Sequence, residues 1–353
     1  MIMANGCTGP IVRYNVDHSV PFADTGSNMS KPDWEVPTSL QPLASDYTFD
    51  LGLALKSIVN LRCFVPDGAM TANTLGQERD GSGVVIDASG LIVTIGYLVT
   101  EAETIWINTH DGRAVPGHAL AMDQTTGFGL VQALGKLDLP ALAIGDSDKL
   151  QVGDPCILAA GCGRQHAVAN KLVARQEFAG YWEYALDEAF YTSPAHPSWG
   201  GAGLIGEDGK LMGIGSLIIQ QGGGRPSRRS DMNMVVPISL LPTILPDLLA
   251  YGRVNRQPRP WLGMYATEDD DKVVVVGTAD NGPAERAGIE AGDRIIAVGK
   301  ENVLDLGGLW RFVCACGPAG TPITLRVVRD DKIFDATVHS IDRTTLLKSP
   351  KLH

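Results

Sequence analysis

Two side chains that could act as a nucleophile and its base lie in one short segment, which runs His196-Pro-Ser-Trp-Gly-Gly-Ala-Gly203. A serine hydroxyl attacks a peptide bond only when a positioned imidazole takes its proton and a carboxylate fixes the tautomer of that imidazole. His196 and Ser198 are two residues apart in a predicted turn, where the ring rarely reaches the hydroxyl, and no carboxylate is evident nearby. The pair is a candidate for a relocated active site, although a structural role in the loop is the favoured interpretation.

The other histidines give no second candidate for acid–base or metal chemistry. His110, His118 and His166 lie in or near predicted turns, where a surface or hydrogen-bonded role is favoured. No pair of residues has the His-x-x-x-His or Cys-x-x-Cys spacing of a metal site. The six cysteines show no disulfide framework, which indicates reduced thiols. We therefore expect no metal and no cofactor.

The elements that position these side chains belong to a turn-rich β protein, since 41 glycines accompany 6% aromatic residues in 353. A chain of this length suits two compact domains plus an extension. The formal net charge of −11 argues against a nucleic-acid-binding surface. One basic cluster departs from this trend: Arg225, Arg228 and Arg229 lie in a glycine-rich loop that could contact an acidic partner segment. A solvated surface loop is the simpler interpretation.

Six segments, in the expected order along the chain, resemble the trypsin-like serine proteases of the HtrA/DegP type. They are Gly81–Gly90, Leu91–Val99, Thr109–Arg113, Asp123–Leu130, Gly145–Asp154 and Gly209–Ser216. The resemblance implies a mostly β fold, with a chymotrypsin-like double β-barrel followed by a PDZ domain. Active members of this family cleave peptide bonds with a serine, a histidine and an aspartate.

The residues that stand at the three catalytic places of this family do not make a triad. Tyr97 occupies the place of the histidine, Gly127 that of the aspartate and Gly200 that of the serine. Ser198 stands where the family has a glycine of its oxyanion hole, and its Cβ restricts the backbone there. The resemblance therefore implies a pseudoprotease that binds rather than cuts. We expect the indole of Trp199 to fill the former substrate cleft, and Trp199 is also a possible contact for a partner.

The last part of the chain resembles a PDZ domain of the HtrA type. Gly282–Ile296 is the most specific match, and Trp261, Leu262, Gly263 and Met264 stand where that family has its carboxylate-binding loop. A PDZ domain adds an extended peptide to its sheet as a strand, and successive backbone N–H groups hold the terminal carboxylate. We therefore expect these four residues to bind the C-terminal tail of a partner. The alternative is a groove that is blocked or used only for packing within the chain.

Composition and the two resemblances together predict five parts. These are an extended N-terminal arm (1–50), a trypsin-like domain (51–250), a linker (251–260), a PDZ domain (261–343) and a C-terminal tail (344–353). Residues 50–60 are expected to begin the second part with a short amphipathic helix. Trp34 in the arm is a candidate anchor for a partner, because aromatic side chains dominate binding hot spots. A partly disordered arm is the alternative.

The leading function is therefore a scaffold, assembly factor or accessory subunit that binds a peptide or protein. The resemblance also implies a homotrimer, since members of this family assemble through residues near the start of the protease domain. Two alternatives stay open: an active endopeptidase with relocated catalytic residues, and a chaperone-like trimer that binds unfolded chains. The first residues lack a basic start and an apolar run, so we expect a cytoplasmic protein. No stretch of the sequence is long and apolar enough to span a membrane.

Overall fold

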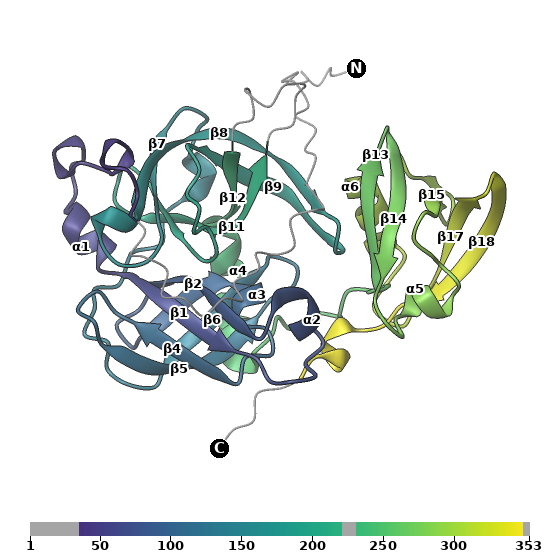
Figure 1. Cartoon of the computed structure of the whole chain (residues 1–353), viewed down its shortest axis with the longest axis horizontal. Helices are drawn as coiled ribbons and strands as arrows, with labels where there is room; N and C mark the ends of the chain where they lie inside the picture. Colours follow the sequence, from purple (N-terminus) through teal and green to yellow (C-terminus); the bar gives the residue numbers. More distant parts are fainter. Residues whose placement is uncertain (1–34, 221–230, 349–353) are drawn as a thin grey trace.

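The computed structural model describes residues 35–220 and 231–348, which form three β-rich bodies (Figure 1). Two closed barrels of six strands each lie side by side, and a smaller sheet with its own helices lies beyond them. The expected mostly β fold with two barrels and a further domain is confirmed. Four residues named above as possible partner contacts lie outside the described residues: Trp34, Arg225, Arg228 and Arg229.

The first barrel is closed in the strand order β1-β2-β3-β6-β5-β4. Its strands are β1 (Ile58–Phe64), β2 (Glu78–Val85), β3 (Leu91–Ile95), β4 (Thr104–Asn108), β5 (Ala114–Met122) and β6 (Phe128–Ala133). Short helices lie before β1 and after β1 and β3: α1 (Leu51–Leu55), α2 (Ala72–Leu75) and α3 (Gly96–Val99). Every residue of β3 is buried, because this strand of the barrel wall pairs with β2 and β6 and also lies against β11 of the second barrel. α3 follows β3 directly, so the barrel wall fixes where this helix begins at the cleft between the barrels.

The helix expected over residues 50–60 is shorter in the structure. α1 ends at Leu55 and β1 already begins at Ile58. Ile58 and Val59 are fully buried and pair with β2, so burial of two β-branched side chains in the barrel outweighs continuation of the helical pattern.

The second barrel is closed in the order β10-β11-β12-β9-β8-β7. Its strands are β7 (Pro155–Ala159), β8 (Ala167–Gly180), β9 (Tyr184–Ser193), β10 (Gly203–Ile205), β11 (Leu211–Gln220) and β12 (Asp231–Pro237). The helical elements around it are η3 (Ser147–Lys149), η4 (Arg164–His166), η6 (Ile238–Leu240) and α4 (Leu241–Tyr251). β8 and β9 form a long hairpin whose tip leaves the barrel and points toward the third body (Figure 1).

The third body is a single sheet in the order β13-β14-β15-β17-β18, with β16 paired to β15. Its elements are β13 (Met264–Asp269), β14 (Lys272–Thr278), α5 (Pro283–Arg286), β15 (Arg294–Val298), β16 (Glu301–Asn302), α6 (Leu306–Ala315), β17 (Pro322–Arg329) and β18 (Lys332–His339). Gly288 follows α5 with a φ of 77°, the left-handed position that favours glycine after a helix. Trp310 of α6 is fully buried in a hydrophobic core separate from that of the barrels. This body is therefore a domain of its own.

The described ends of the chain pack against the barrels. The N–H of Val36 donates to the Gln165 carbonyl at 2.8 Å, although η1 (Thr38–Leu40) and η2 (Ala44–Asp46) beside it are largely exposed. After η7 (Arg343–Leu346), the N–H of Lys348 donates to the Glu101 carboxylate at 2.8 Å, so the chain returns from the third domain to the first barrel. The third domain is thus tied to the barrels at both of its ends.

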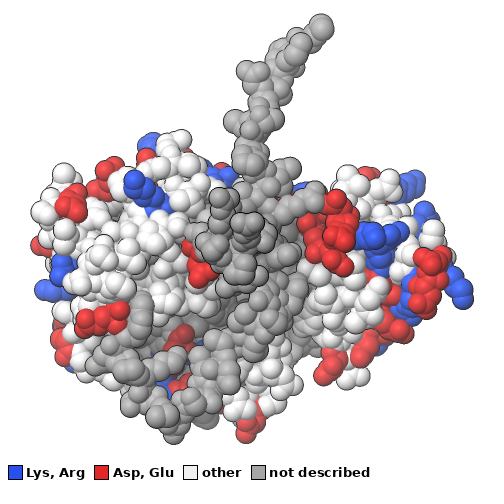
Figure 2. Space-filling model, turned by 45° about the horizontal axis from the view of Figure 1, so that its top comes forward, with Lys and Arg blue, Asp and Glu red and all other residues white. Residues whose placement is uncertain are grey.

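Charged side chains are unevenly distributed over the described surface. In the view of Figure 2 much of the barrel surface is uncharged, whereas acidic and basic side chains are interspersed over the third domain. Ion pairs within the third domain, such as that of Arg326 with Asp335, account for part of this mixture.

Candidate functional site

The three positions assigned to a triad converge at the cleft between the two barrels. Tyr97 lies in α3 directly after β3, Gly127 directly before β6, and Gly200 shortly before β10. The N–H of Gly96 donates to the Gly127 carbonyl at 2.6 Å. A Cβ atom built on Gly200 would lie 2.7 Å from the Tyr97 hydroxyl. A side chain at position 200 would therefore point at residue 97, as a nucleophile points at its base, but glycine has none.

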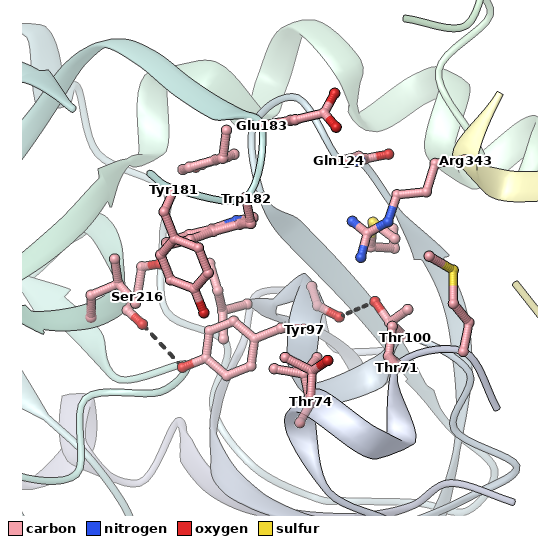
Figure 3. Close-up of a pocket in the computed structure, with 18 of the residues that line it drawn as sticks. Thr71, Thr74, Tyr97, Thr100, Gln124, Tyr181, Trp182, Glu183, Ser216 and Arg343 are labelled. Carbon is pink, nitrogen blue, oxygen red and sulfur yellow. Dashed lines mark hydrogen bonds between the residues drawn. The ribbon is translucent and has the colours of Figure 1, made fainter. Parts of the chain in front are cut away.

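Tyr97 is held as a neutral phenol. Its hydroxyl donates to the Ser216 carbonyl at 3.0 Å, as Figure 3 shows, and the Trp199 side chain hydrogen-bonds the same tyrosine. Burial raises the pKa of Tyr97 above its ordinary value. A phenol that stays protonated and already donates its proton to a carbonyl cannot accept a proton from a nucleophile at neutral pH.

Tyr184 of β9 fills the space where a side chain at position 127 would lie. Gly127 has a φ of 83°, and a Cβ atom there would lie 2.9 Å from the Tyr184 hydroxyl. That hydroxyl donates to the Thr126 carbonyl at 2.8 Å, and burial raises its pKa. An aspartate at position 127 would therefore have to displace a buried, hydrogen-bonded ring.

The nearest acid in the same loop, Asp123, is committed to the loop itself. Its Oδ2 accepts from both the N–H and the hydroxyl of Thr126 at 2.9 Å, and its Oδ1 accepts from Arg256 at 2.6 Å. The carboxylate thus joins the loop to the segment that leads to the third domain, and its oxygens do not face Tyr97 as a triad member would.

The pair His196 and Ser198 is brought together through the backbone. Nδ1 of the buried His196 ring accepts from the Ser198 N–H at 2.9 Å, so the ring proton is on Nε2, which donates to the His166 carbonyl at 3.1 Å. Burial lowers the pKa of His196 to about 4. The ring therefore shapes the loop as a neutral imidazole, and the exposed Ser198 side chain is not its partner in either bond.

The remaining histidines do not join this site. His110 is exposed at a turn, His118 is half-buried on β5, and His166 belongs to η4. In the two described ranges, no group of three or more histidine, cysteine, aspartate or glutamate side chains could hold a metal ion. No helix of the described chain is both long and apolar enough to cross a bilayer.

A cavity of about 130 Å³ opens beside Tyr97, between the barrels and the third domain. Five aromatic rings line it: Tyr97, Tyr181, Trp182, Tyr184 and Tyr265. Figure 3 shows Tyr97, Tyr181 and Trp182 grouped on one side, with Arg343 across from them. The hairpin between β8 and β9 supplies three of these rings, whereas Trp199, which was expected to fill the cleft, is half-buried and contacts Tyr97 instead.

The expected carboxylate-binding loop of the third domain does hold a carboxylate, and it belongs to the same chain. The N–H groups of Leu262 and Met264 donate to the Glu183 carboxylate at 3.0 and 2.9 Å, and the N–H of Gly263 also favours its charged form. Trp261 lies just outside these bonds, where its backbone pairs with that of Ile341. No local pattern pointed to Glu183, because its partners lie 79 and 81 residues away in sequence.

Comparisons with known proteins agree with this arrangement of domains. A family model of the trypsin-like peptidase domain matches residues 81–214, and one of the PDZ domain matches residues 260–339. A probable periplasmic serine endoprotease, DegP-like, of Chlamydia muridarum is 26% identical over 276 residues, which cover 74% of this chain and 54% of the relative. The periplasmic serine endoprotease DegP of Escherichia coli K12 is 26% identical over 284 residues, which cover 75% of this chain and 58% of the relative.

Solved structures share the fold. A variant of the HtrA-type protease AlgW with a tripeptide matches 85% of this chain and 96% of its own, with a TM-score of 0.51 and 22% identity. The chain therefore has the architecture of an HtrA/DegP-type trypsin-like protease domain with a C-terminal PDZ domain. It spans little more than half the length of the curated relatives described above.

Proposed function

We propose that this chain is a non-catalytic pseudoprotease that binds protein or peptide partners as a scaffold, assembly factor or accessory subunit. One observation supports the proposal above all others. A side chain at position 200 would point at the Tyr97 hydroxyl from 2.7 Å, yet position 200 is a glycine. The atom that would attack a peptide bond is missing where the facing residue would have to activate it.

The surroundings of Gly200 also disfavour catalysis. Tyr97 donates its proton to the Ser216 carbonyl and so cannot act as a base. Ser198 brings a Cβ atom to a turn in which the family uses glycine to form an oxyanion hole. Removal of a single triad member lowers kcat by several orders of magnitude, and here all three positions differ.

Peptide hydrolysis is the second candidate function, because the relatives are named as serine endoproteases. It would require a nucleophile elsewhere in the cleft, and Ser198 beside His196 is the available pair. The ring of His196 accepts from the Ser198 backbone N–H, and this geometry does not activate the hydroxyl. Hydrolysis therefore ranks below binding.

The PDZ domain supports a protein or peptide as the partner. A stable subunit of a hetero-complex is the favoured assembly, and a homotrimer that shields unfolded chains is the alternative. The two differ in a measurable way. A subunit purifies from its own cells with one partner in fixed ratio, whereas a chaperone-like trimer purifies without a fixed partner and suppresses aggregation of unfolded proteins.

The test of catalysis uses the full chain with a fluorophosphonate probe and unfolded casein, and trypsin as the active control. We expect no labelling and no cleavage. Labelling that disappears in the Ser198→Ala variant would instead establish a relocated active site and overturn the proposal. Native mass spectrometry of the protein isolated at low salt then measures the assembly, and a stoichiometric partner is the expected result.

A further inference from the structure

The tip of the β8–β9 hairpin lies beside β13 and α6 (Figure 1), the strand and the helix that flank the peptide groove in a PDZ domain, and it contacts both. On one wall, the Ala266 N–H of β13 donates to the Tyr181 carbonyl at 3.0 Å. On the other wall, Nε1 of Trp310 in α6 donates to the Gly180 carbonyl at 2.9 Å. Two neighbouring carbonyls of the hairpin are therefore held from opposite walls, one by a backbone N–H of β13 and one by a side chain of α6.

The end of the groove is occupied as well. The carboxylate of Glu183 is surrounded by the N–H groups of Leu262, Gly263 and Met264, and only 8% of Glu183 is exposed. A carboxylate is costly to bury unless charge-assisted hydrogen bonds replace its water. Convergent backbone donors supply these bonds, in the way that a PDZ loop holds the end of a peptide, and they offset part of the cost of burial.

Other residues of the hairpin also contact the PDZ domain. Ala179 and Ala185 pack against the hydrophobic core of the PDZ domain. Glu177 forms an ion pair with Arg311 of α6 at the rim of the groove. The hairpin thus makes apolar, backbone and charged contacts with the walls, and a second peptide would need the same donors.

We infer that residues 177–185 are the resident ligand of the PDZ groove, with the side-chain carboxylate of Glu183 in the place of a peptide's terminal carboxylate. A partner's C-terminus enters this groove only when the hairpin leaves it. The inference concerns the PDZ domain alone and holds whether or not the barrels retain any hydrolytic activity.

The test compares the full-length wild type with Glu183→Ala, which removes the acceptor, and with Glu183→Gln, which keeps an oxygen for the same N–H groups. Glu188→Ala is the matched control, because Glu188 lies on the same hairpin and pairs with Arg175 of the barrel. The probes are fluorescein-labelled decapeptides that end in alanine, valine, leucine or phenylalanine, each with a free or an amidated C-terminus. Binding is measured by fluorescence anisotropy.

We expect Glu183→Ala to bind at least one free-carboxylate peptide at least tenfold more tightly than the wild type and Glu188→Ala do. Glu183→Gln should stay close to the wild type, and amidated peptides should gain nothing. Equal binding of the free-carboxylate peptides by the wild type and Glu183→Ala, including equal failure to bind, would overturn the inference.

A second measurement keeps the test informative if Glu183→Ala is poorly folded. Hydrogen exchange followed by mass spectrometry reports the backbone N–H groups of residues 261–266 directly. We expect this segment to exchange at least tenfold faster in Trp310→Phe, which loses the indole N–H donor to Gly180 and part of a buried ring, than in the wild type. Exchange in β17, which contributes to the same hydrophobic core, should rise much less if release of the hairpin rather than loosening of the core is the cause. Unchanged exchange in both Trp310→Phe and Glu183→Ala would contradict a docked hairpin.

Discussion

The barrel cleft and the PDZ loop of this chain differ in what faces their converging groups. In the cleft, Tyr97 faces Gly200, which has no side chain, and the Tyr97 hydroxyl donates to the Ser216 carbonyl. The groove keeps its converging N–H groups, and these already hold the carboxylate of Glu183. A site built from side chains disappears with a few substitutions, whereas a site built from backbone donors persists as long as the fold does.

One hairpin joins the two regions. Its neighbouring residues Glu183 and Tyr184 reach to opposite sides, since Glu183 binds the PDZ loop and Tyr184 donates to the Thr126 carbonyl beside Gly127. The same hairpin tip therefore blocks the place of the triad aspartate and occupies the peptide groove. The predictions below separate these two roles.

The largest effect is expected where the Tyr184 hydroxyl lies against Gly127. Gly127→Ala should lower the free energy of unfolding by about 3 kcal/mol, because a left-handed backbone is strained by a side chain and the new Cβ lies 2.9 Å from the Tyr184 hydroxyl. Gly112→Ala is the control: its φ of 81° is similar, but nothing lies within 4 Å of the new atom, so it should lose only about 1 kcal/mol. Urea denaturation measures both, and equal losses would mean that Tyr184 does not restrict position 127.

The contact in the PDZ groove should depend on pH. Burial is the largest cause that raises the pKa of Glu183, from its ordinary 4.5 to about 7, against the lowering effect of three backbone N–H groups and Arg343. A raised folded-state pKa means that the folded protein binds this proton more tightly than the unfolded chain does. The contribution of Glu183 to the free energy of unfolding should therefore be complete below pH 4.5. It should fall as the pH rises to about 7, by at most about 1.4 kcal/mol per pH unit.

Glu183→Gln isolates this contribution, because the amide keeps an acceptor but does not titrate. Denaturation at several pH values between 4.5 and 7 measures the unfolding free energy of the wild type and of Glu183→Gln. The wild-type value minus the Glu183→Gln value should fall as the pH rises. A difference that stays constant over this range would show that Glu183 is already ionised at low pH in the groove.

A smaller effect is expected for the phenol at the former histidine place. Tyr97→Phe leaves the buried Ser216 carbonyl without this donor and should cost about 1 kcal/mol. Tyr251→Phe on α4 is the control, because Tyr251 is 63% exposed and its loss should not be detectable. Thermal unfolding measures both, and hydrogen exchange in residues 261–266 should stay as in the wild type because the bond from Tyr97 to the Ser216 carbonyl involves none of the N–H groups of that segment.

The smallest effect is expected at the rim of the groove. Glu177→Gln removes the ion pair with Arg311, both side chains of which are well exposed, and should change stability by no more than about 0.5 kcal/mol. Exchange of the loop at Leu262 to Met264 should be unaltered, in contrast to Glu183→Ala. If Glu177→Gln releases the loop as strongly as Glu183→Ala, the rim rather than the buried carboxylate holds the hairpin.

Much of the fold could be predicted from the sequence because its signals are local. Gly90 takes its expected turn between β2 and β3 with a φ of 84°, and Gly288 ends α5 as expected. The helix expected over residues 50–60 was wrong because the local pattern carried no information about the β2 partner of Ile58. The Trp199 hypothesis concerned the filling of the cleft and did not foresee that this side chain hydrogen-bonds Tyr97 or that three rings of the hairpin line the cavity.

The sequence by itself determined which groups are present: Gly200 has no nucleophile, and the loop from Leu262 to Met264 has backbone donors. The tertiary structure alone decided what faces them. It brought Tyr184 to Gly127 and Glu183 to the PDZ loop, across long separations in the chain. The physical reason is that chemistry is a property of each side chain, whereas the occupancy of a site depends on where a distant hairpin packs.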